Sequence, residues 1–231
     1  MLFRSARLHE YAEAWSYYLI KASVDLAKER GACSKSNETR YSQRVMPIDT
    51  YKRDIDELVE PVYKMDWDKL REDARAYGIF NSTLMALMPA ETSAQISNST
   101  NGIEPPRSLV SIKQSKDGVL KQVVPSVHRL KNKYNLLWDQ KSPEGYLKIC
   151  AVLQKFIDQG ISVNTSYNPK HYSEEQVPLS VLIKDILLSY KWGIKQLYYN
   201  NTLDGAGELE TASQTSLSEL PPEEDCESCK I

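Results

Sequence analysis

Two cysteines close to the C-terminal end have the spacing of a redox or metal-binding pair. Cys226 and Cys229 form a CxxC motif, which supplies either a reversible dithiol or two of the four ligands that zinc usually needs. None of the three histidines (His9, His128, His171) lies at metal-ligand spacing beside the motif. We therefore favour the dithiol and expect no metal bound by this chain. Four flanking acidic residues disfavour the thiolate, which suits a relay thiol better than a reactive nucleophile.

An adjacent pair of tyrosines could carry out a different chemistry. The phenols of Tyr198 and Tyr199 can each lose an electron and a proton together, so two rings held close can relay a radical. Packing is the more common explanation, because the chain has 14 tyrosines and strands favour aromatic residues. Neighbours in a regular strand also face opposite sides. A stacked relay would therefore need the strand to end or twist near Asn200 and Asn201.

A third candidate is a junction between an apolar run and a polar turn. The run over 83–88 ends at Pro89, and Thr92 or Ser93 can open a short helix. Free N–H groups and the positive end of a helix dipole make such a junction a natural phosphate site. The alternative is an ordinary N-capped helix after a strand, which the pattern alone favours.

The elements that must position these residues alternate between helix and strand. Apolar residues at spacings of three and four predict helices, whereas short apolar or alternating runs predict strands. The predicted helices cover 8–30, 66–77, 146–157 and 179–190, with strands at 83–88, 119–124, 161–165 and 194–199. Asp66 should cap the second helix and Gly78 should end it, while the strand at 83–88 should be buried on both faces. This order indicates an α/β body with parallel strands.

The chain divides by composition into a body, 1–202, and a tail, 203–231. The tail is rich in Gly, Ser, Thr and Glu and holds eight acidic residues and one lysine, a net charge of −7. The body then has 28 of the 29 basic and 23 of the 31 acidic residues, a net charge of +5. We expect a flexible tail whose linker, about 22 residues long, reaches about 25 Å and can carry the CxxC across a domain surface.

Composition also limits which classes of protein the chain can belong to. The chain is 41% hydrophobic and 26% charged, as in ordinary globular proteins, and we find no signal peptide and no membrane-spanning stretch. A body of +5 without an Arg/Lys stripe is weak support for nucleic acid, so we expect no nucleic-acid partner. Cys33 and Cys150 are scattered body residues, and four cysteines are too few for a secreted disulfide framework. A cytoplasmic location is expected, in the host if a phage encodes the chain.

Several motifs together resemble one family. The chain from about residue 8 to 231 is similar, in one register, to the C-terminal part of class I ribonucleotide reductase large subunits, and bacterial and phage members are most similar. The segments that carry the resemblance are Asn81-Ser82-Thr83-Leu84, Ala86-Leu87-Met88-Pro89, Glu91-Thr92-Ser93, Gln95-Ile96-Ser97-Asn98, Thr100 to Arg107, Gln154 to Gln159, Leu197-Tyr198-Tyr199 with Asn201-Thr202, and the terminal CxxC-Lys-Ile.

The resemblance implies a role for each candidate. A loop would hold the substrate, a ribonucleoside diphosphate, through Pro89, Ala90, Glu91, Thr92 and Ser93. Tyr199 would receive the radical from the metal-containing small (beta) subunit, and Tyr198 would pass it inward. Cys226 and Cys229 would reduce the active-site disulfide and then be reduced by thioredoxin or glutaredoxin. Where this chain has Ala90 the family often has a hydroxyl residue, which removes one side-chain contact but leaves the backbone donors.

The resemblance also implies what must come from elsewhere. The family's fold is an α/β barrel of two halves, each a parallel five-stranded sheet, and this chain would supply only the C-terminal portion. The thiyl-radical cysteine, the two active-site redox cysteines, the ATP-cone and the effector region lie upstream of the matched part. Half a barrel would expose unpaired strand edges. We therefore expect a naturally split large subunit, inactive alone, with a separate N-terminal polypeptide as partner.

Two other functions stay open. The chain could be a non-catalytic relic that binds the small subunit or the reductase and regulates it, or a free-standing dithiol carrier that uses only Cys226 and Cys229. Retention of all three features favours the enzyme component, because a relic would be expected to lose some of them.

Overall fold

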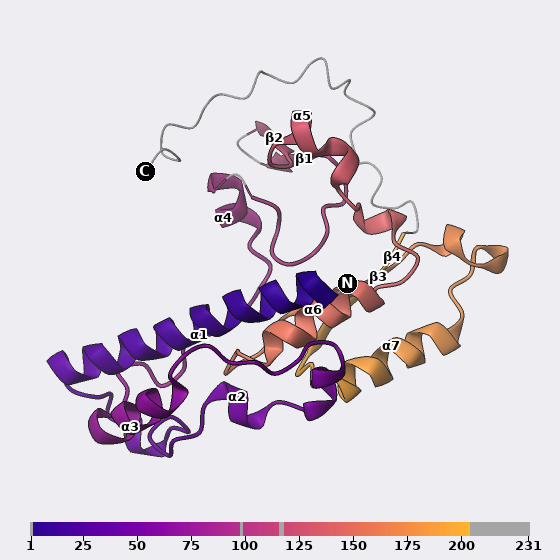
Figure 1. Cartoon of the computed structure of the whole chain (residues 1–231). Helices are drawn as coiled ribbons and strands as arrows, with labels where there is room; N and C mark the ends of the chain where they lie inside the picture. The colour runs from indigo at the N-terminus through magenta and orange to yellow at the C-terminus, as the bar shows by residue number, and fades with distance from the viewer. Residues whose placement is uncertain (1, 98, 116–117, 204–231) are drawn as a thin grey trace. The chain divides into compact units, whose positions relative to one another are not determined.

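A computed structural model describes residues 2–97, 99–115 and 118–203 of the chain (Figure 1). Two compact units divide it: unit 1 comprises Met1–Met88, Ser142–Thr165 and Pro178–Asn200, and unit 2 comprises Pro89–Lys141, Ser166–Val177 and the segment that follows Asn200. Almost the whole predicted tail lies outside the described residues. The helices and strands are α1 (Leu2–Arg30), α2 (Pro47–Thr50), α3 (Trp67–Tyr77), α4 (Glu91–Ile96), β1 (Val110–Ser115), β2 (Gly118–Val123), α5 (Val127–Leu130), α6 (Glu144–Gln154), β3 (Val163–Tyr167), α7 (Leu179–Lys191) and β4 (Leu197–Thr202).

Short 3₁₀ helices fill much of the remaining chain. They are η1 (Ser36–Glu38), η2 (Arg53–Glu57), η3 (Lys131–Lys133), η4 (Leu137–Asp139), η5 (Pro169–His171) and η6 (Ser173–Glu175). Two of them, with α2, lie between α1 and α3, where the sequence predicted neither helix nor strand. Tight single turns of this kind are common connectors because their hydrogen-bond geometry does not support long runs.

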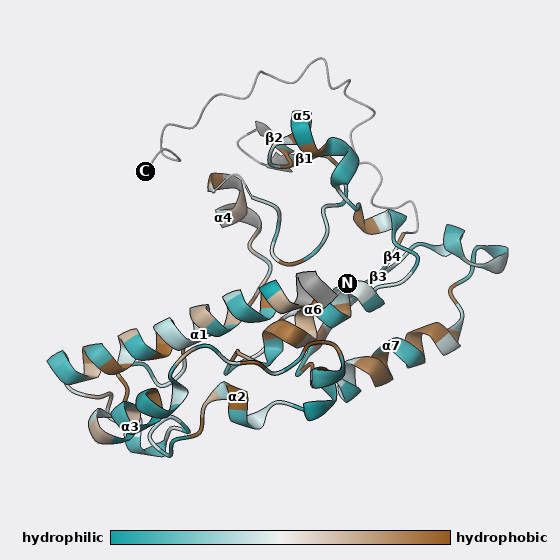
Figure 2. Ribbon diagram, in the orientation of Figure 1, coloured by the Kyte–Doolittle hydropathy of each residue, from teal (hydrophilic) through white to brown (hydrophobic). Residues whose placement is uncertain are grey.

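The core of unit 1 forms where α1 packs against α3 and α6 (Figure 1). One face of α1 buries Ile20 and Val24, and α6 buries Leu147 and Cys150 without exposed surface. Hydropathy follows the same division, since α6 is largely apolar whereas the solvent side of α1 is mixed (Figure 2). The predicted helices at 66–77 and 179–190 are confirmed within one residue. The helix predicted at 8–30 begins earlier, at Leu2, and the one predicted at 146–157 runs from Glu144 to Gln154.

The two ends of α3 follow from its capping residues. The Asp66 carboxylate accepts a hydrogen bond from the N–H of Lys69, as an N-cap residue should. Gly78 then takes a φ of +73°, and a Cβ at that position would lie 2.5 Å from the Ser36 hydroxyl oxygen. A side chain there would be both strained and crowded, so glycine is required to end this helix.

Parallel strand pairing in unit 1 brings together three segments that are distant in the sequence. Leu87 pairs with Ile161 in a parallel bridge, and β3 pairs with β4. The contacts of Asn164 with Tyr199 and of Thr165 with Asn200 advance in the same direction along both strands, as in a parallel pair. The strand predicted at 83–88 is reduced to this single bridge and is not buried throughout, because Met85 is buried whereas Met88 is 61% exposed.

Unit 2 contains an antiparallel hairpin that the sequence predicted only in part. β1 pairs with β2 from Val110 opposite Val123 to Ser115 opposite Gly118. The strand expected at 119–124 corresponds to β2, but its partner β1 was missed. The run 110–115 alternates apolar and polar residues only weakly, so its pairing depends on the neighbouring strand rather than on its own pattern.

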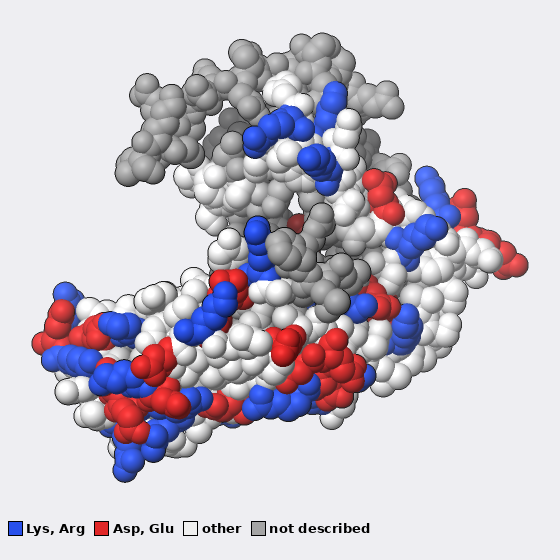
Figure 3. Space-filling model, viewed as in Figure 1, with Lys and Arg blue, Asp and Glu red and all other residues white. Residues whose placement is uncertain are grey.

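Charged side chains of both signs are interspersed over the part of unit 1 that holds α1 and α3 (Figure 3). Lys28 on α1 pairs with Asp73 on α3 at 3.1 Å, and Lys69 pairs with the same carboxylate at 2.7 Å. Within the described ranges, no helix combines the length and the apolar character needed to cross a membrane.

Candidate functional site

The two candidate relay tyrosines lie on β4 with their rings in contact. The ring centroids of Tyr198 and Tyr199 are 4.2 Å apart and tilted by 55°. The Tyr199 hydroxyl lies 3.4 Å from the Tyr198 hydroxyl and donates to it. This bond is the main reason why the pKa of Tyr199 is raised above its usual value. The arrangement can therefore move a proton and an electron between the same two rings.

A stacked pair was expected only if the strand ended or twisted near Asn200 and Asn201. The rings meet, although the strand does not end there. β4 continues through Thr202, and the N–H of Tyr199 donates to the Asn164 side-chain oxygen on β3 at 3.0 Å. Both rings are more than half exposed, at 52% and 57%. Because little packs against them, the side chains can lean together along the open face of the strand.

The candidate phosphate loop lies in unit 2 and opens α4. Pro89 and Ser93 are exposed, and Ala90 is half-buried. The helix begins at Glu91, just before Thr92 and Ser93, the two predicted starts. The N–H of Ala90 donates to the Asn101 side-chain oxygen at 2.8 Å, so this backbone donor already has a partner within unit 2. The first N–H groups of a helix have no partner within it.

Asp158 holds the segment that leads toward this loop. Its carboxylate accepts the N–H of Leu84 at 2.8 Å, the N–H of Met85 at 2.9 Å and the hydroxyl of Tyr41 at 2.7 Å. Burial, followed by the bond to this carboxylate, raises the pKa of Tyr41. The three donors come from two separate parts of unit 1, Tyr41 and the 84–85 segment, and all bind one carboxylate. These bonds hold the segment before Met88 in place within unit 1.

A second contact fixes the start of the same segment against α1. The Ser23 hydroxyl donates to the Asn81 side-chain oxygen at 3.0 Å, and the Asn81 N–H donates back to Ser23 at 2.9 Å. The motif that begins at Asn81 is therefore attached to α1 at its first residue and to Asp158 at its fourth and fifth.

A buried polar cluster packs beside His9 of α1. Lys155, almost fully buried, pairs with Asp56 at 3.1 Å and stands 4.3 Å above the Tyr51 ring. His9 packs edge-on against Phe156, with ring centroids 4.8 Å apart. Burial, and then the positive charge of Lys155, lowers the pKa of His9 from 6.5 to about 4. His9 is therefore a neutral core residue.

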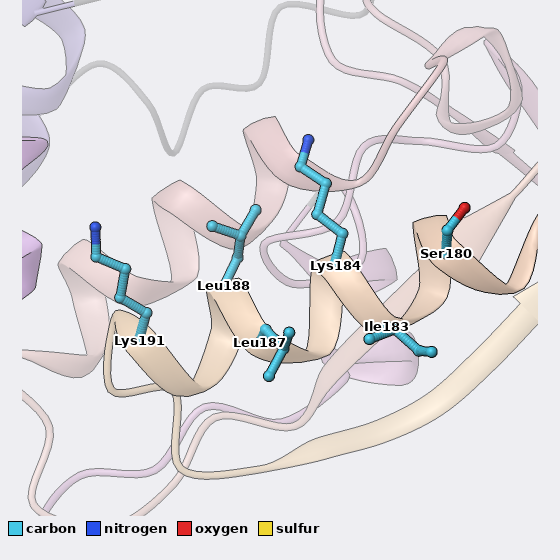
Figure 4. Close-up of a pocket in the computed structure, with 6 residues that line it drawn as sticks. All are labelled: Ser180, Ile183, Lys184, Leu187, Leu188 and Lys191. Atoms are coloured by element: carbon cyan, nitrogen blue, oxygen red, sulfur yellow. The ribbon is translucent and has the colours of Figure 1, made fainter.

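The exposed face of α7 is apolar to an unusual degree. Leu179, Ile183, Ile186, Leu187 and Tyr190 are all between 47% and 71% exposed. An open groove runs along this helix, lined by Ile183, Leu187 and Leu188 with Ser180, Lys184 and Lys191 (Figure 4). Contiguous exposed apolar patches of this kind mark protein or membrane contacts, ligand-binding grooves or aggregation-prone surfaces.

The predicted dithiol, Cys226 and Cys229, lies outside the described residues. Of the two body cysteines, Cys150 is buried and Cys33 is half-buried, and no disulfide joins them. In the part of the chain that the structure describes, no cluster of His, Cys, Asp or Glu could hold a metal ion. The tyrosine pair belongs to unit 1, whereas residues 89–93 belong to unit 2.

Sequence reasoning missed the residues that hold the candidates in place. Asp158 and Asn101 stand in motifs identified in the sequence, and Asn164 stands in a predicted strand, but their hydrogen bonds reach partners that spacing does not reveal. A polar side chain that is not fully exposed needs a hydrogen-bond partner, but the sequence alone does not identify that partner.

Comparison with known proteins relates the chain to one family. The model of the ribonucleotide reductase barrel domain matches residues 5–200. The chain is 56% identical over 202 residues to the ribonucleoside-diphosphate reductase subunit alpha of Haemophilus influenzae. It is 52% identical over 225 residues to the ribonucleoside-diphosphate reductase 1 subunit alpha of Escherichia coli, and 44% identical over 225 residues to the subunit alpha of Enterobacteria phage T4.

These matches cover nearly all of this chain but a small part of each relative. The Haemophilus match spans 87% of this chain and 27% of the relative, and the Escherichia and phage matches each span 96% and 29%. The chain thus corresponds to somewhat more than a quarter of a reductase alpha subunit. The expected resemblance to the C-terminal part of bacterial and phage large subunits is confirmed.

Proposed function

The chain belongs to the ribonucleotide reductase family through its barrel domain, and from this premise we propose that it is a component of a ribonucleoside-diphosphate reductase. The enzyme would reduce ribonucleoside diphosphates to 2′-deoxyribonucleoside diphosphates by radical chemistry. The observation that carries the proposal is the Tyr198–Tyr199 pair, with centroids 4.2 Å apart, in a chain 56% identical to a reductase alpha subunit.

Within this function, the tyrosine pair relays a radical one hydrogen atom at a time. Tyr199 gives an electron and a proton to the oxidant that arrives from the small subunit, and the resulting Tyr199 radical takes an electron and a proton from Tyr198. The 3.4 Å separation of the two hydroxyl oxygens supports direct transfer between them. Tyr198 then passes the radical inward by the same exchange with its next partner.

The other two candidates bind substrate and restore the enzyme. Residues 89–93 hold the diphosphate through N–H groups at the start of α4, with Asn101 fixing the turn. Cys226 and Cys229 give two electrons and two protons to the oxidised active-site disulfide and become a disulfide themselves. An external dithiol protein, thioredoxin or glutaredoxin, reduces them again.

We propose that another polypeptide supplies the rest of the large subunit. The relatives are more than three times as long as their match to this chain, and the thiyl-radical cysteine of the family lies outside the matched motifs. The apolar face of α7 supports assembly with another protein, because a helix face with Leu187 61% exposed is unfavourable in water. We propose an N-terminal large-subunit chain and the small subunit as partners, and no activity for this chain alone.

Replacement of Tyr199 by phenylalanine separates this function from its alternatives. Phenylalanine keeps the ring and its packing but cannot lose a phenolic hydrogen, so reconstituted turnover should disappear while assembly survives. Tyr77→Phe is the matched control, since Tyr77 is 51% exposed on α3 and contacts no candidate residue. A regulatory relic or a dithiol carrier would be indifferent to both changes, and equal activity of the two variants would refute the relay.

A further inference from the structure

Five successive carbonyls after α6 each accept a hydrogen bond from another part of unit 1. We call residues 156–160 the 156–160 turn. Its first carbonyl accepts from the Ser16 hydroxyl at 2.8 Å, and its last accepts from the N–H of Leu87 at 3.2 Å. The three between them, those of Ile157, Asp158 and Gln159, accept from the ammonium of one residue, Lys195, at 3.0, 2.8 and 2.7 Å.

The chemistry of this contact suits a lysine. Carbonyls just past the C-terminal end of a helix carry partial negative charge and lack partners within the helix, so they favour a cation. An ammonium has three N–H donors, one for each of the three carbonyls. Burial of the ammonium lowers the pKa of Lys195, and the nearby Asp158 carboxylate opposes this effect. Gln154 adds a bond from its amide nitrogen to the Gln159 carbonyl at 3.1 Å.

Lys195 stands at the start of the strand that carries the tyrosine pair. Gly193, with a φ of +77°, turns the chain out of α7, and β4 begins two residues after Lys195, at Leu197. Further along this strand, the N–H of Tyr199 donates to the Asn164 side-chain oxygen in unit 1. Because both tyrosine rings are more than half exposed, packing does not hold them, and their placement depends on these backbone anchors.

The same turn also holds the segment that leads to Pro89. Leu87 is joined to Gly160 and Ser162 through its N–H and carbonyl, and Asp158 holds Leu84 and Met85. A shift of the 156–160 turn relative to β4 would therefore move the tyrosine pair relative to this segment. Misplacement by about 1 Å away from the reacting atoms can cost about a hundredfold in rate.

We propose that Lys195 is a positioning residue for the Tyr198–Tyr199 pair, because its ammonium fixes the start of β4 on the 156–160 turn. The inference rests on the proposed function for its consequence in catalysis, but not for its structural content. It predicts that loss of the three ammonium bonds changes the environment of the Tyr199 ring, without any change to the ring itself.

The test uses the full chain with 3-fluorotyrosine at position 199, observed by ¹⁹F NMR. Lys195→Met keeps the aliphatic length and removes all three donors, so the resonance should move or broaden beyond its linewidth, whereas Lys195→Arg should largely restore it. Lys133→Met is the control, because Lys133 is exposed on η3. An unchanged resonance in a folded Lys195→Met chain would overturn the inference. Should this variant not fold, Lys195→Gln carries the same comparison.

Turnover in the reconstituted enzyme separates the positioning role of Lys195 from the proposed radical relay. Lys195→Met should lower turnover by about tenfold or more, with assembly unchanged and Lys195→Arg recovering most of the loss. If Tyr199→Phe abolishes turnover but Lys195→Met changes neither turnover nor the resonance, the positioning role is wrong and the relay stands. If the resonance moves but Tyr199→Phe keeps full turnover, the positioning role stands and the relay is wrong.

Discussion

The side-chain oxygen of Asn101 accepts the backbone N–H of Ala90 at 2.8 Å, across eleven residues of sequence. Two segments that sequence similarity identifies separately, the candidate phosphate loop and the Thr100–Gly102 motif, are therefore parts of one turn. The bond also explains how the loop tolerates alanine at position 90. The conformation depends on a backbone donor at that position and not on a side chain.

Asn101→Ala should weaken substrate binding more than it slows the chemical step. Loss of this bond frees the turn before α4 and leaves a backbone donor without its partner, a cost of about 1 to 2 kcal/mol, or about five- to thirtyfold in KM. Steady-state kinetics of the reconstituted enzyme measure this directly. Asn132→Ala, at an exposed position of η3 in the same unit, should leave KM unchanged. A loss confined to kcat would contradict the assigned role.

Asp158→Asn should destabilise unit 1. The carboxylate accepts three hydrogen bonds, from Tyr41, Leu84 and Met85, and an amide offers only one oxygen while it turns an N–H₂ toward a donor. The expected loss in free energy of unfolding is about 2 to 3 kcal/mol, measured by urea denaturation. Asp68→Asn removes a carboxylate that is 96% exposed and should change stability by less than about 0.5 kcal/mol. Equal effects would show that the Asp158 bonds add little.

The stability of the chain should fall in mild acid because of His9. Its pKa is about 4 in the folded chain, against 6.5 for an unperturbed histidine, so between these values the unfolded chain binds a proton that the folded chain does not. The contribution is complete above pH 6.5 and is lost as the pH falls. Between pH 7.5 and pH 5 the free energy of unfolding should drop by about 2 kcal/mol from this residue.

His9→Phe isolates that effect. Phenylalanine fits an apolar ring site beside Phe156 and cannot titrate, so the variant should lose about 2 kcal/mol less than the parent chain over the same pH range. His128→Asn, at an exposed position, should retain the parent's pH dependence. Identical pH profiles for the parent and His9→Phe would mean that His9 is not held neutral.

Alternation of helix and strand, and the ends of the helices, could be predicted from the sequence, because they depend on local features. Asp66 and Gly78 mark the limits of α3 through capping and a positive φ, and both act within one or two turns. The predicted strand at 83–88 was too long. An apolar run indicates that a segment is buried, but it does not indicate how many of its residues pair with another strand. Leu87 finds one, and Met88 is left exposed.

The candidate residues themselves could also be identified from the sequence, but not the contacts that place them. The contact between Tyr198 and Tyr199 contradicts the simple alternation of side chains along a strand, and the two residue types do not predict it. Asp158 and Lys195 are joined to their partners across 74 and 37 residues of sequence. Such long-range bonds follow from tertiary packing, which local patterns do not encode.

The terminal dithiol should matter only when a protein reductant supplies the electrons. With thioredoxin as reductant, Cys226→Ser or Cys229→Ser should lower turnover by about tenfold or more. A single thiol can form a mixed disulfide with the active site, but a second thiol is needed to complete the reduction and release the tail. A small dithiol that reaches the active site directly should restore much of the activity. Cys33→Ser removes a body cysteine and should have no effect. Normal thioredoxin-dependent turnover in either tail variant would exclude the shuttle.

The most direct test of the central claim is a reconstitution. The chain would be combined with an N-terminal large-subunit polypeptide, a radical-bearing small subunit, an effector, a ribonucleoside diphosphate and a dithiol, and deoxyribonucleotide formation would be followed as each protein is omitted in turn. We predict turnover in the complete mixture and none when any of the three proteins is left out. Undiminished turnover without this chain, or no turnover from a stable complete complex, would contradict the claim that it is a working part of a reductase.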